Sequence, residues 1–199
     1  MMNSGAHFEH RVRKSIEASI SAKQQLLENA DVIAVVSSVA GILIDAFRAG
    51  KKVLLFGNGG SAADAQHIAA EFVGRFAFDR AALPALALSV NTSCVTAIGN
   101  DYGFDLVFSR QIEALAHSGD VAIGISTSGN SPNVLRAMAT AKKMGLYTVG
   151  LTGSKGDKLA GAVDHCIAVP SNETPRIQEC HILIGHIISE LVEKAIFHE

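Results

Sequence analysis

The sequence predicts an α/β fold: an open, doubly wound sheet of five parallel strands with helices on both faces, in three layers. Five short apolar runs are continuous rather than alternating, which is typical of parallel strands buried on both faces. Segments with helical periodicity lie between most of these runs, and such strand–helix alternation indicates a parallel sheet. The five runs are Lys52–Phe56, Ala85–Val90, Val121–Ser126, Thr148–Thr152 and Cys166–Val169.

The predicted helices follow from apolar periodicity and from residues that begin or end a helix. They cover Ser61–Arg75, Phe104–His117 and Pro132–Met144, and a long final helix runs from about Pro175 to Phe197. Ser131 followed by Pro132 is typical of an N-cap and the first helical position. Gly145 is typical of the residue that ends a helix. These signals mark both ends of the predicted helix over Pro132–Met144.

About fifty residues precede the first strand and are predicted to form one or two further helices. The most apolar stretch of the chain, Val32–Ile44, is too short to cross a bilayer. Its apolar residues recur at helical spacing, so we interpret it as a core or subunit-contact helix and expect no membrane partner. The sequence contains no internal repeat, low-complexity tract or linker. We therefore predict one domain over 1–199, with N-terminal helices in 1–50 and the α/β core with its C-terminal helix in 51–199.

The amino-acid composition limits which partners and which cellular compartment we expect for the protein. The 199 residues are 48% hydrophobic and 18% charged with a net charge of −2, which is typical of a globular protein. Lysine pairs occur only at Lys51-Lys52 and Lys142-Lys143, so we expect no nucleic-acid partner. The three cysteines are widely spaced and form no C-x-x-C motif, which argues against a disulfide framework or a thiolate zinc site. We expect a soluble, cytoplasmic protein.

Two Gly/Ser loops carry most of the functional information. GNGGSA at Gly57–Ala62 and STSGNS at Ser126–Ser131 each follow a predicted strand and open into a predicted helix. A loop at such a crossover directs unpaired backbone N–H groups and the positive end of a helix dipole at one point. In open α/β sheets, ligands bind at the carboxyl ends of the strands, where both loops lie. The two loops predict a pocket for a phosphorylated, hydroxyl-rich small molecule.

A nucleotide site is a weaker interpretation of these loops. The first can be written G-x-G-x-x-A, but a dinucleotide site needs an acidic residue at the end of the second strand, and Leu88-Ser89-Val90-Asn91 has none. A Walker loop is absent because no Gly-Lys-Ser/Thr follows. A tight crossover turn without a ligand would account for one such loop better than for two at one sheet edge. Ser131 has two compatible roles, as a helix cap and as a ligand contact.

Four longer motifs then resemble a known family. GNGGSAADAQHIAAEF, AIGNDYGF, ISTSGNSPNV and RIQECHILIGH, in this order, resemble the sugar isomerase (SIS) domain family and, within it, the phosphoheptose isomerases. The resemblance runs from about Lys51 to the C-terminus. It implies a flavodoxin-like sheet, a homotetramer with active sites at subunit contacts, and one Zn²⁺ per subunit. It also implies a ketose–aldose isomerase that converts sedoheptulose 7-phosphate to D-glycero-D-manno-heptose 7-phosphate, the first step toward ADP-heptose for lipopolysaccharide.

The resemblance assigns roles to individual residues. It implies that Glu71 and His186 are catalytic. The implied metal ligands are His67, Glu71, Gln178 and His186. The implied substrate contacts are Asn58, Gly59, Gly60, Glu71, Asn100, Asp101, Ser126, Thr127, Ser128, Ser131 and Gln178.

Helical geometry supports part of this assignment and leaves part open. His67 and Glu71 are spaced i, i+4 and share one helix face, although a lone pair at that spacing is more often a solvated contact. Gln178 and His186 lie about 80° apart around the final helix, and His181 lies about 60° to the other side of Gln178. Spacing therefore does not say which histidine joins the site. The resemblance selects His186 and leaves His181 as a packed or interface residue.

The implied chemistry suits these residue types. Ketose–aldose isomerisation removes a proton beside a carbonyl, and Glu71 can act as the base with His186 as the acid. Zinc could polarise the carbonyl and enediol oxygens. Two rival functions are a non-catalytic SIS-domain scaffold that binds the replication initiator and a sugar-phosphate sensor. The scaffold lacks the carboxylate of the H-x-x-x-E pair, which this chain keeps as Glu71, and a sensor needs the Ser/Thr loop without Glu71 and His186.

Overall fold

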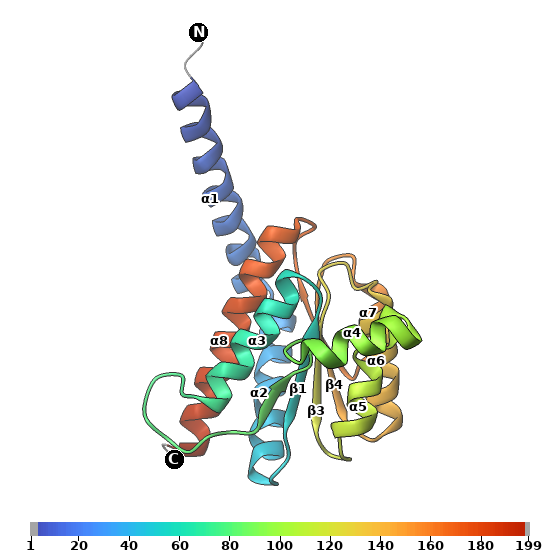
Figure 1. Ribbon diagram of the computed structural model, residues 1–199. Coiled ribbons are helices and arrows are strands. Elements are labelled where there is room, and N and C mark those ends of the chain that lie inside the picture. Colours follow the sequence, from blue (N-terminus) through green and yellow to red (C-terminus); the bar gives the residue numbers. More distant parts are fainter. Residues whose placement is uncertain (1–3, 198–199) are drawn as a thin grey trace.

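A computed structural model describes residues 4–197 and has a five-stranded, wholly parallel sheet at its centre (Figure 1). The strand order is β2-β1-β3-β4-β5, which is the flavodoxin-like order. The predicted fold class is therefore confirmed. The strands are β1 (Val53–Gly57), β2 (Ala85–Ala87), β3 (Val121–Ile125), β4 (Tyr147–Gly153) and β5 (His165–Val169).

The sheet is buried on both faces, which explains the continuous apolar runs in the sequence. In β1, Val53 and Leu55 point into one apolar core, and Leu54 and Phe56 point into the other. All four side chains are fully buried. Because successive side chains of a strand alternate between faces, a strand covered on both sides must be apolar at every position.

Helices cover the two faces in separate layers (Figure 1). One face carries α2 (Ala30–Arg48), α3 (Gly60–Val73) and α8 (Thr174–Phe197), which pack against one another and against the sheet. The other face carries α5 (Ser109–Leu115), α6 (Pro132–Lys143) and α7 (Asp157–Ala160), preceded by α4 (Thr92–Tyr102) and the 3₁₀ turn η1 (Phe104–Leu106). The N-terminal helix α1 (Ser4–Glu28) projects away from the body.

The apolar helix α2 lies in the core, as one of the two alternatives in its interpretation predicts. Val39 and Leu43 are completely buried, and the helix contacts α8 and β5. Within the described residues it is the one helix long and apolar enough to meet a membrane-span criterion by length and composition. Its packing against the sheet accounts for that composition. Not every apolar residue of α2 is buried, since Ile33 is 45% exposed.

The structure differs from the predicted elements in the segment after β2. The strand ends at Ala87 rather than Val90, and Asn91 then caps α4, its side-chain oxygen accepting a hydrogen bond from the Cys94 N–H over 3.1 Å. The predicted helix over Phe104–His117 is divided into η1 and α5. Gln111 joins these pieces to the residue that follows β2, because its buried amide donates to the Leu88 and Val107 carbonyls over 2.9 and 2.7 Å.

Candidate active site

The two Gly/Ser loops lie at the topological switch point of the sheet. β1 and β3 are neighbours, and the chain leaves β1 for α3 on one face and β3 for α6 on the other. The loops are joined through the amides of Asn58 and Asn133, which exchange two hydrogen bonds of 2.9 Å. Asn133 belongs to the second loop's helix and was not among the predicted site residues. It lies only two residues after Ser131, in the first turn of α6, and this closeness to the second Gly/Ser loop was the signal that could have drawn attention to it.

The first loop requires glycine at two points where other groups approach closely. A Cβ on Gly57 would lie 2.7 Å from the carbonyl oxygen of Ile125, and the amide of Gln178 occupies the place of a Cβ on Gly60. Gly59, the residue before α3, has φ of +54°, a conformation that favours glycine. The close approach of Gln178 brings α8 to the start of α3, where the sequence predicts substrate contacts.

Hydroxyl groups organise the second loop. The Oγ atoms of Ser126 and Ser131 lie 2.9 Å apart, and the Oγ of Ser128 accepts a hydrogen bond of 3.2 Å from the Asn130 N–H. Ser131 is the residue before α6, as predicted, but its side chain makes no capping hydrogen bond. The Asn133 side chain instead accepts from the Val134 N–H over 2.9 Å. The prediction that the Ser131 side chain caps α6 is therefore wrong. Its hydroxyl pairs with that of Ser126 within the loop.

A cleft beside this loop adds a cation that sequence reasoning missed. Thr127 and Ser128 line it together with Lys155, Asn172 and Ile177. Lys155 follows β4, so it reaches the same carboxyl edge of the sheet as the Gly/Ser loops. Its position after the fourth predicted strand was the available signal. The cleft joins hydroxyl donors to a positive charge, which suits a phosphate.

Three of the four predicted metal ligands meet between α3 and α8. The Nε2 of His67 lies 2.9 Å from the Nε2 of His186 and 3.2 Å from the Oε1 of Glu71. The ligand atoms of the three residues all lie within 4.8 Å of one another. The Glu71 side chain is 20% exposed and that of His67 is 51% exposed, so the cluster is open on one side.

This donor set fits a zinc ion. Ligand atoms bound to a tetrahedral Zn²⁺ at about 2.0–2.2 Å lie roughly 3.3–3.6 Å apart, somewhat more than the 2.9 and 3.2 Å that separate the Nε2 of His67 from its two neighbours. Imidazole nitrogens and a carboxylate oxygen are also ligands that zinc accepts. An Nε2 carries at most one hydrogen, so the Nε2 of His67 could satisfy only one of its two neighbours by donating a hydrogen bond. A shared cation would satisfy all three groups.

Gln178, the fourth predicted ligand, lies at the other end of the same helix pair. It packs on Gly60 at the first turn of α3, whereas His67 lies seven residues further along, about 10 Å by the helical rise. The two helices run side by side with their N-termini at the carboxyl edge of the sheet (Figure 1). Gln178 therefore stands between the Gly/Ser loops and the His67–Glu71–His186 cluster.

Packing separates the two histidines of α8 that spacing left ambiguous. His181 is fully buried against the sheet, and its Nε2 lies 3.2 Å from the carbonyl oxygen of Thr152, to which it can donate. Burial lowers the pKa of His181 to about 4, against the opposing effect of that hydrogen bond. His186 faces α3 instead, and its ring also contacts Phe76. The structure thus places His186 beside His67 and leaves His181 as a packed residue.

Asp64 is a further carboxylate near the cluster that sequence reasoning missed. It lies one turn before His67 on α3, and its Oδ2 is buried without a hydrogen-bond partner in the described protein. Burial raises the pKa of Asp64 to about 6, while the nearby His67 acts in the opposite direction. The D-x-x-H spacing, which places the two residues on one helix face, was the signal for it.

Asn100 and Asp101 lie apart from the other predicted site residues. Both are at the exposed end of α4, where the Nδ2 of Asn100 donates to the Oδ1 of Asp101 over 2.8 Å. Within the described residues they form no hydrogen bond to either Gly/Ser loop or to the His67 cluster. The chain therefore brings together the two loops, Gln178 and the three-residue cluster, but not these two side chains.

Comparisons with known proteins agree on one family. The SIS domain matches residues 7–153. The phosphoheptose isomerase of Aneurinibacillus thermoaerophilus is 55% identical over 186 residues, which are 94% of each chain. That of Sulfurimonas denitrificans is 54% identical over 186 residues, 94% of this chain and 95% of its own. The solved phosphoheptose isomerase of Neisseria gonorrhoeae is 42% identical and superposes with a TM-score of 0.88, covering 94% of this chain and 99% of that one.

Proposed function

The chain belongs to the SIS domain family and, within it, to the phosphoheptose isomerases, and we propose that it isomerises sedoheptulose 7-phosphate to D-glycero-D-manno-heptose 7-phosphate at the His67–Glu71–His186 cluster. The observation that carries the location is the meeting of two imidazoles and a carboxylate between α3 and α8. Glu71 distinguishes this isomerase from the scaffold and sensor alternatives, which do not need its carboxylate.

The substrate phosphate is assigned to the second Gly/Ser loop. Thr127, Ser128 and Lys155 line one cleft with Ile177, the residue before Gln178. From Gln178 to His186 is eight residues of α8, about 12 Å. That separation is comparable to the length of an extended seven-carbon sugar phosphate. The phosphate would thus bind at the loop while the carbonyl end of the sugar reaches the cluster.

The protein residues carry out the proton transfers. Glu71 removes a proton from C1 of the ketose, the electron pair forms the C1–C2 double bond, and negative charge develops on O2. The Oε1 of Glu71 faces His67, which leaves Oε2 for the substrate proton. The proton returns to C2, while O1 gives up its hydroxyl proton to become the aldehyde oxygen and O2 gains a proton to become a hydroxyl, which gives the aldose. His186 serves as the acid for the sugar oxygens, and because its Nε2 faces His67, its Nδ1 remains for proton exchange.

The cofactor proposed for this site is one Zn²⁺ per subunit, held by His67, Glu71, Gln178 and His186. When bound, zinc supplies a Lewis acid that polarises the carbonyl and enediol oxygens. Gln178 is the fourth proposed ligand, although in this structure its amide packs on Gly60 and the other three residues form the cluster.

We assign the protein to a homotetramer with active sites at subunit contacts. Helix α1 projects from the body and exposes an apolar stripe at one helix face, and α4 contains no buried residue although it carries Asn100 and Asp101. A neighbouring subunit that covers these surfaces would explain both and would bring the two side chains to a site. The stripe consists of Phe8, Val12, Ile16, Ile20 and Leu27. Mass measurement in solution tests the assembly, and a monomer would contradict it.

The compartment and pathway follow from the same assignment. The cysteines Cys94, Cys166 and Cys180 are free, which suits the reducing cytoplasm. The heptose 7-phosphate product would enter the synthesis of ADP-heptose for lipopolysaccharide. Recovery of the protein from a membrane or periplasmic fraction would contradict the cytoplasmic assignment.

The test of the proposed function is turnover of sedoheptulose 7-phosphate by Zn²⁺-loaded protein and its Glu71→Gln variant. The variant keeps the size of the side chain but removes the base, so kcat should fall by roughly 10²–10⁴-fold. Glu190→Gln is the matched control, because Glu190 lies on α8 in an ion pair with Lys194 and should leave kcat unchanged. A folded, metal-loaded wild type without turnover would favour the scaffold or sensor.

A further inference from the structure

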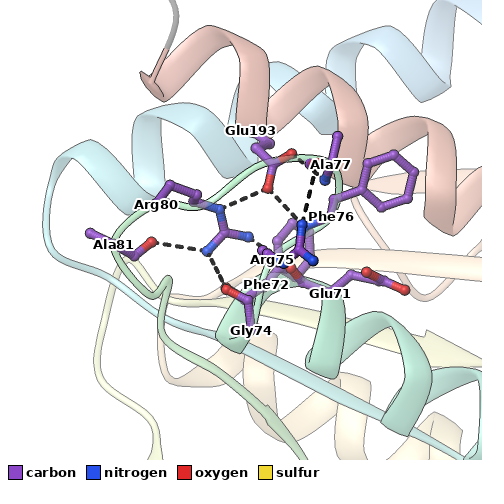
Figure 2. Close-up of polar contacts among 9 residues, drawn as sticks. All are labelled: Glu71, Phe72, Gly74, Arg75, Phe76, Ala77, Arg80, Ala81 and Glu193. Carbon is purple, nitrogen blue, oxygen red and sulfur yellow. Dashed lines mark hydrogen bonds and ion pairs between the residues drawn. The ribbon is translucent and has the colours of Figure 1, made fainter.

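A buried ion pair joins the segment that follows α3 to α8, beyond the candidate active site. The Nε of Arg80, in the segment after α3, donates to the Oε1 of Glu193 on α8 over 2.9 Å (Figure 2). Each side chain is only 2% exposed. Removing two charges from water is costly, so a buried ion pair is weak evidence of added stability and invites a search for a second role.

The guanidinium of Arg80 donates hydrogen bonds to backbone carbonyl oxygens at the end of α3. Its Nη2 donates to the carbonyl oxygen of Glu71 over 2.7 Å, and its Nη1 donates to those of Phe72 and Gly74 over 2.7 and 3.2 Å. The last carbonyls of a helix lack partners within the helix and carry partial negative charge, which a guanidinium neutralises. Arg80 therefore fixes the turn of α3 that carries the proposed base.

The carboxylate of Glu193 accepts hydrogen bonds from backbone N–H groups of the segment that follows α3. Its Oε1 accepts from the Phe76 N–H over 2.8 Å, and its Oε2 accepts from the Ala77 N–H over 2.7 Å. Burial acts to raise the pKa of Glu193, but the two N–H groups and the Arg80 guanidinium lower it overall, so the carboxylate is ionised at neutral pH. Its hydrogen bonds thus fix the backbone at Phe76.

Each residue of the ion pair is connected to a residue of the candidate active site. Arg80 touches the backbone of Glu71, whose carboxylate points away from the guanidinium (Figure 2). Phe76 packs on the ring of His186, with the ring centroids 5.8 Å apart. Glu193 follows His186 by seven residues, which places the two on nearly the same face of α8, about two turns apart. The pair therefore links the helix that carries the base to the helix that carries the acid.

We propose that Arg80 and Glu193 are positioning residues that set Glu71 and His186 at their working separation. This inference rests on the proposed function for its kinetic readout, but the geometry of the His67–Glu71–His186 cluster can also be read from Zn²⁺ affinity alone. Arg80 acts through the backbone of Glu71, and Glu193 acts through the backbone and ring of Phe76. Neither side chain needs to touch the sugar.

The experiment compares Arg80→Lys and Glu193→Gln with the wild type. Lysine keeps the charge but lacks the planar fork that reaches several carbonyls, and glutamine removes the charge at nearly constant size. Loss of groups that orient metal ligands typically lowers affinity or activity about 10–100-fold. We expect losses of that size in Zn²⁺ affinity, measured by chelator competition, and in kcat, with KM near its wild-type value because the phosphate loop is untouched.

Controls separate positioning from mere stability. Glu190→Gln, in the exposed ion pair with Lys194 on the same helix, should match the wild type in both readouts. Phe76→Leu leaves the ion pair intact but removes the aromatic ring that contacts His186. It should therefore also lower Zn²⁺ affinity and kcat. This variant tests the proposal if Arg80→Lys and Glu193→Gln do not fold. Folded variants with a lower Tm but wild-type Zn²⁺ affinity and kcat would overturn the proposal. Failure of the proposed function looks different, since the wild type itself would then lack turnover.

Discussion

Replacing His181 by glutamine should flatten the dependence of folding stability on pH. His181 is fully buried, its Nδ1 has no hydrogen-bond partner among the described groups, and its pKa is about 4 compared with an ordinary value of 6.5. Glutamine can still donate a hydrogen bond to the carbonyl of Thr152 but does not titrate. The substitution therefore removes the proton equilibrium while keeping the main polar contact.

The magnitude follows from the difference between the folded and unfolded pKa values. Between pH 6.5 and pH 4 the unfolded chain binds a proton at His181 that the folded chain does not, so stability is present above pH 6.5 and is lost as the pH falls. The wild type should lose about 2 kcal/mol from this group by pH 5, and the loss should level off below the folded pKa. Other titrating groups are common to both proteins and cancel in the comparison.

The assay is urea unfolding of metal-free wild type and His181→Gln at pH 7.5, 6 and 5, at one protein concentration because assembly shifts apparent stability. Chelator is included since zinc binding is itself pH-dependent. The free energy of unfolding of the wild type should fall relative to that of the variant as the pH decreases. Parallel profiles for the two proteins would refute the burial of a neutral imidazole at this position.

Three further predictions concern the site itself. Ser128→Ala removes a hydroxyl from the proposed phosphate cleft, so steady-state kinetics should show a higher KM with kcat nearly kept; a pure loss of kcat would place the phosphate elsewhere. His186→Ala should lower both bound zinc and turnover, while His181→Ala should leave zinc content unchanged by metal analysis; the reverse result would mean that the wrong histidine was assigned. Gly60→Ala places a methyl group where the Gln178 amide lies, so Zn²⁺ affinity should fall in a protein that still folds; unchanged affinity would remove Gln178 from the ligand set.

The sheet and the Gly/Ser loops were predictable because their signals are local. A strand buried on both faces is apolar at every position, and glycine and serine after such a strand mark a crossover whatever the distant packing. Helix α4 escaped prediction for the converse reason. It is only 11 residues long and none of its residues is buried, so its sequence lacks the extended apolar face of a core helix. Its start was marked only by Asn91, whose side chain accepts from the Cys94 N–H.

The Arg80–Glu193 pair could not be predicted because it depends on a contact between distant segments. Arg80 and Glu193 are 113 residues apart, and a lone charge in a loop or on a helix usually lies in solvent. Only the packing of α3 against α8 brings them together. The choice between His181 and His186 also depends on packing. Helical spacing gives the angles between side chains around the axis of α8, but it does not say which side of the helix faces the sheet. Packing turns His181 toward Thr152 on β4 and His186 toward α3.

Proton exchange with solvent tests the central claim most directly. Zn²⁺-loaded protein is incubated with sedoheptulose 7-phosphate in D₂O, and the sugars are followed by NMR. A base at Glu71 that removes the C1 proton predicts heptose 7-phosphate as product and deuterium at C1 of the recovered ketose, with both lost in Glu71→Gln and kept in Glu190→Gln. Near-normal exchange in Glu71→Gln, or no exchange in the folded and metal-loaded wild type, would contradict the account.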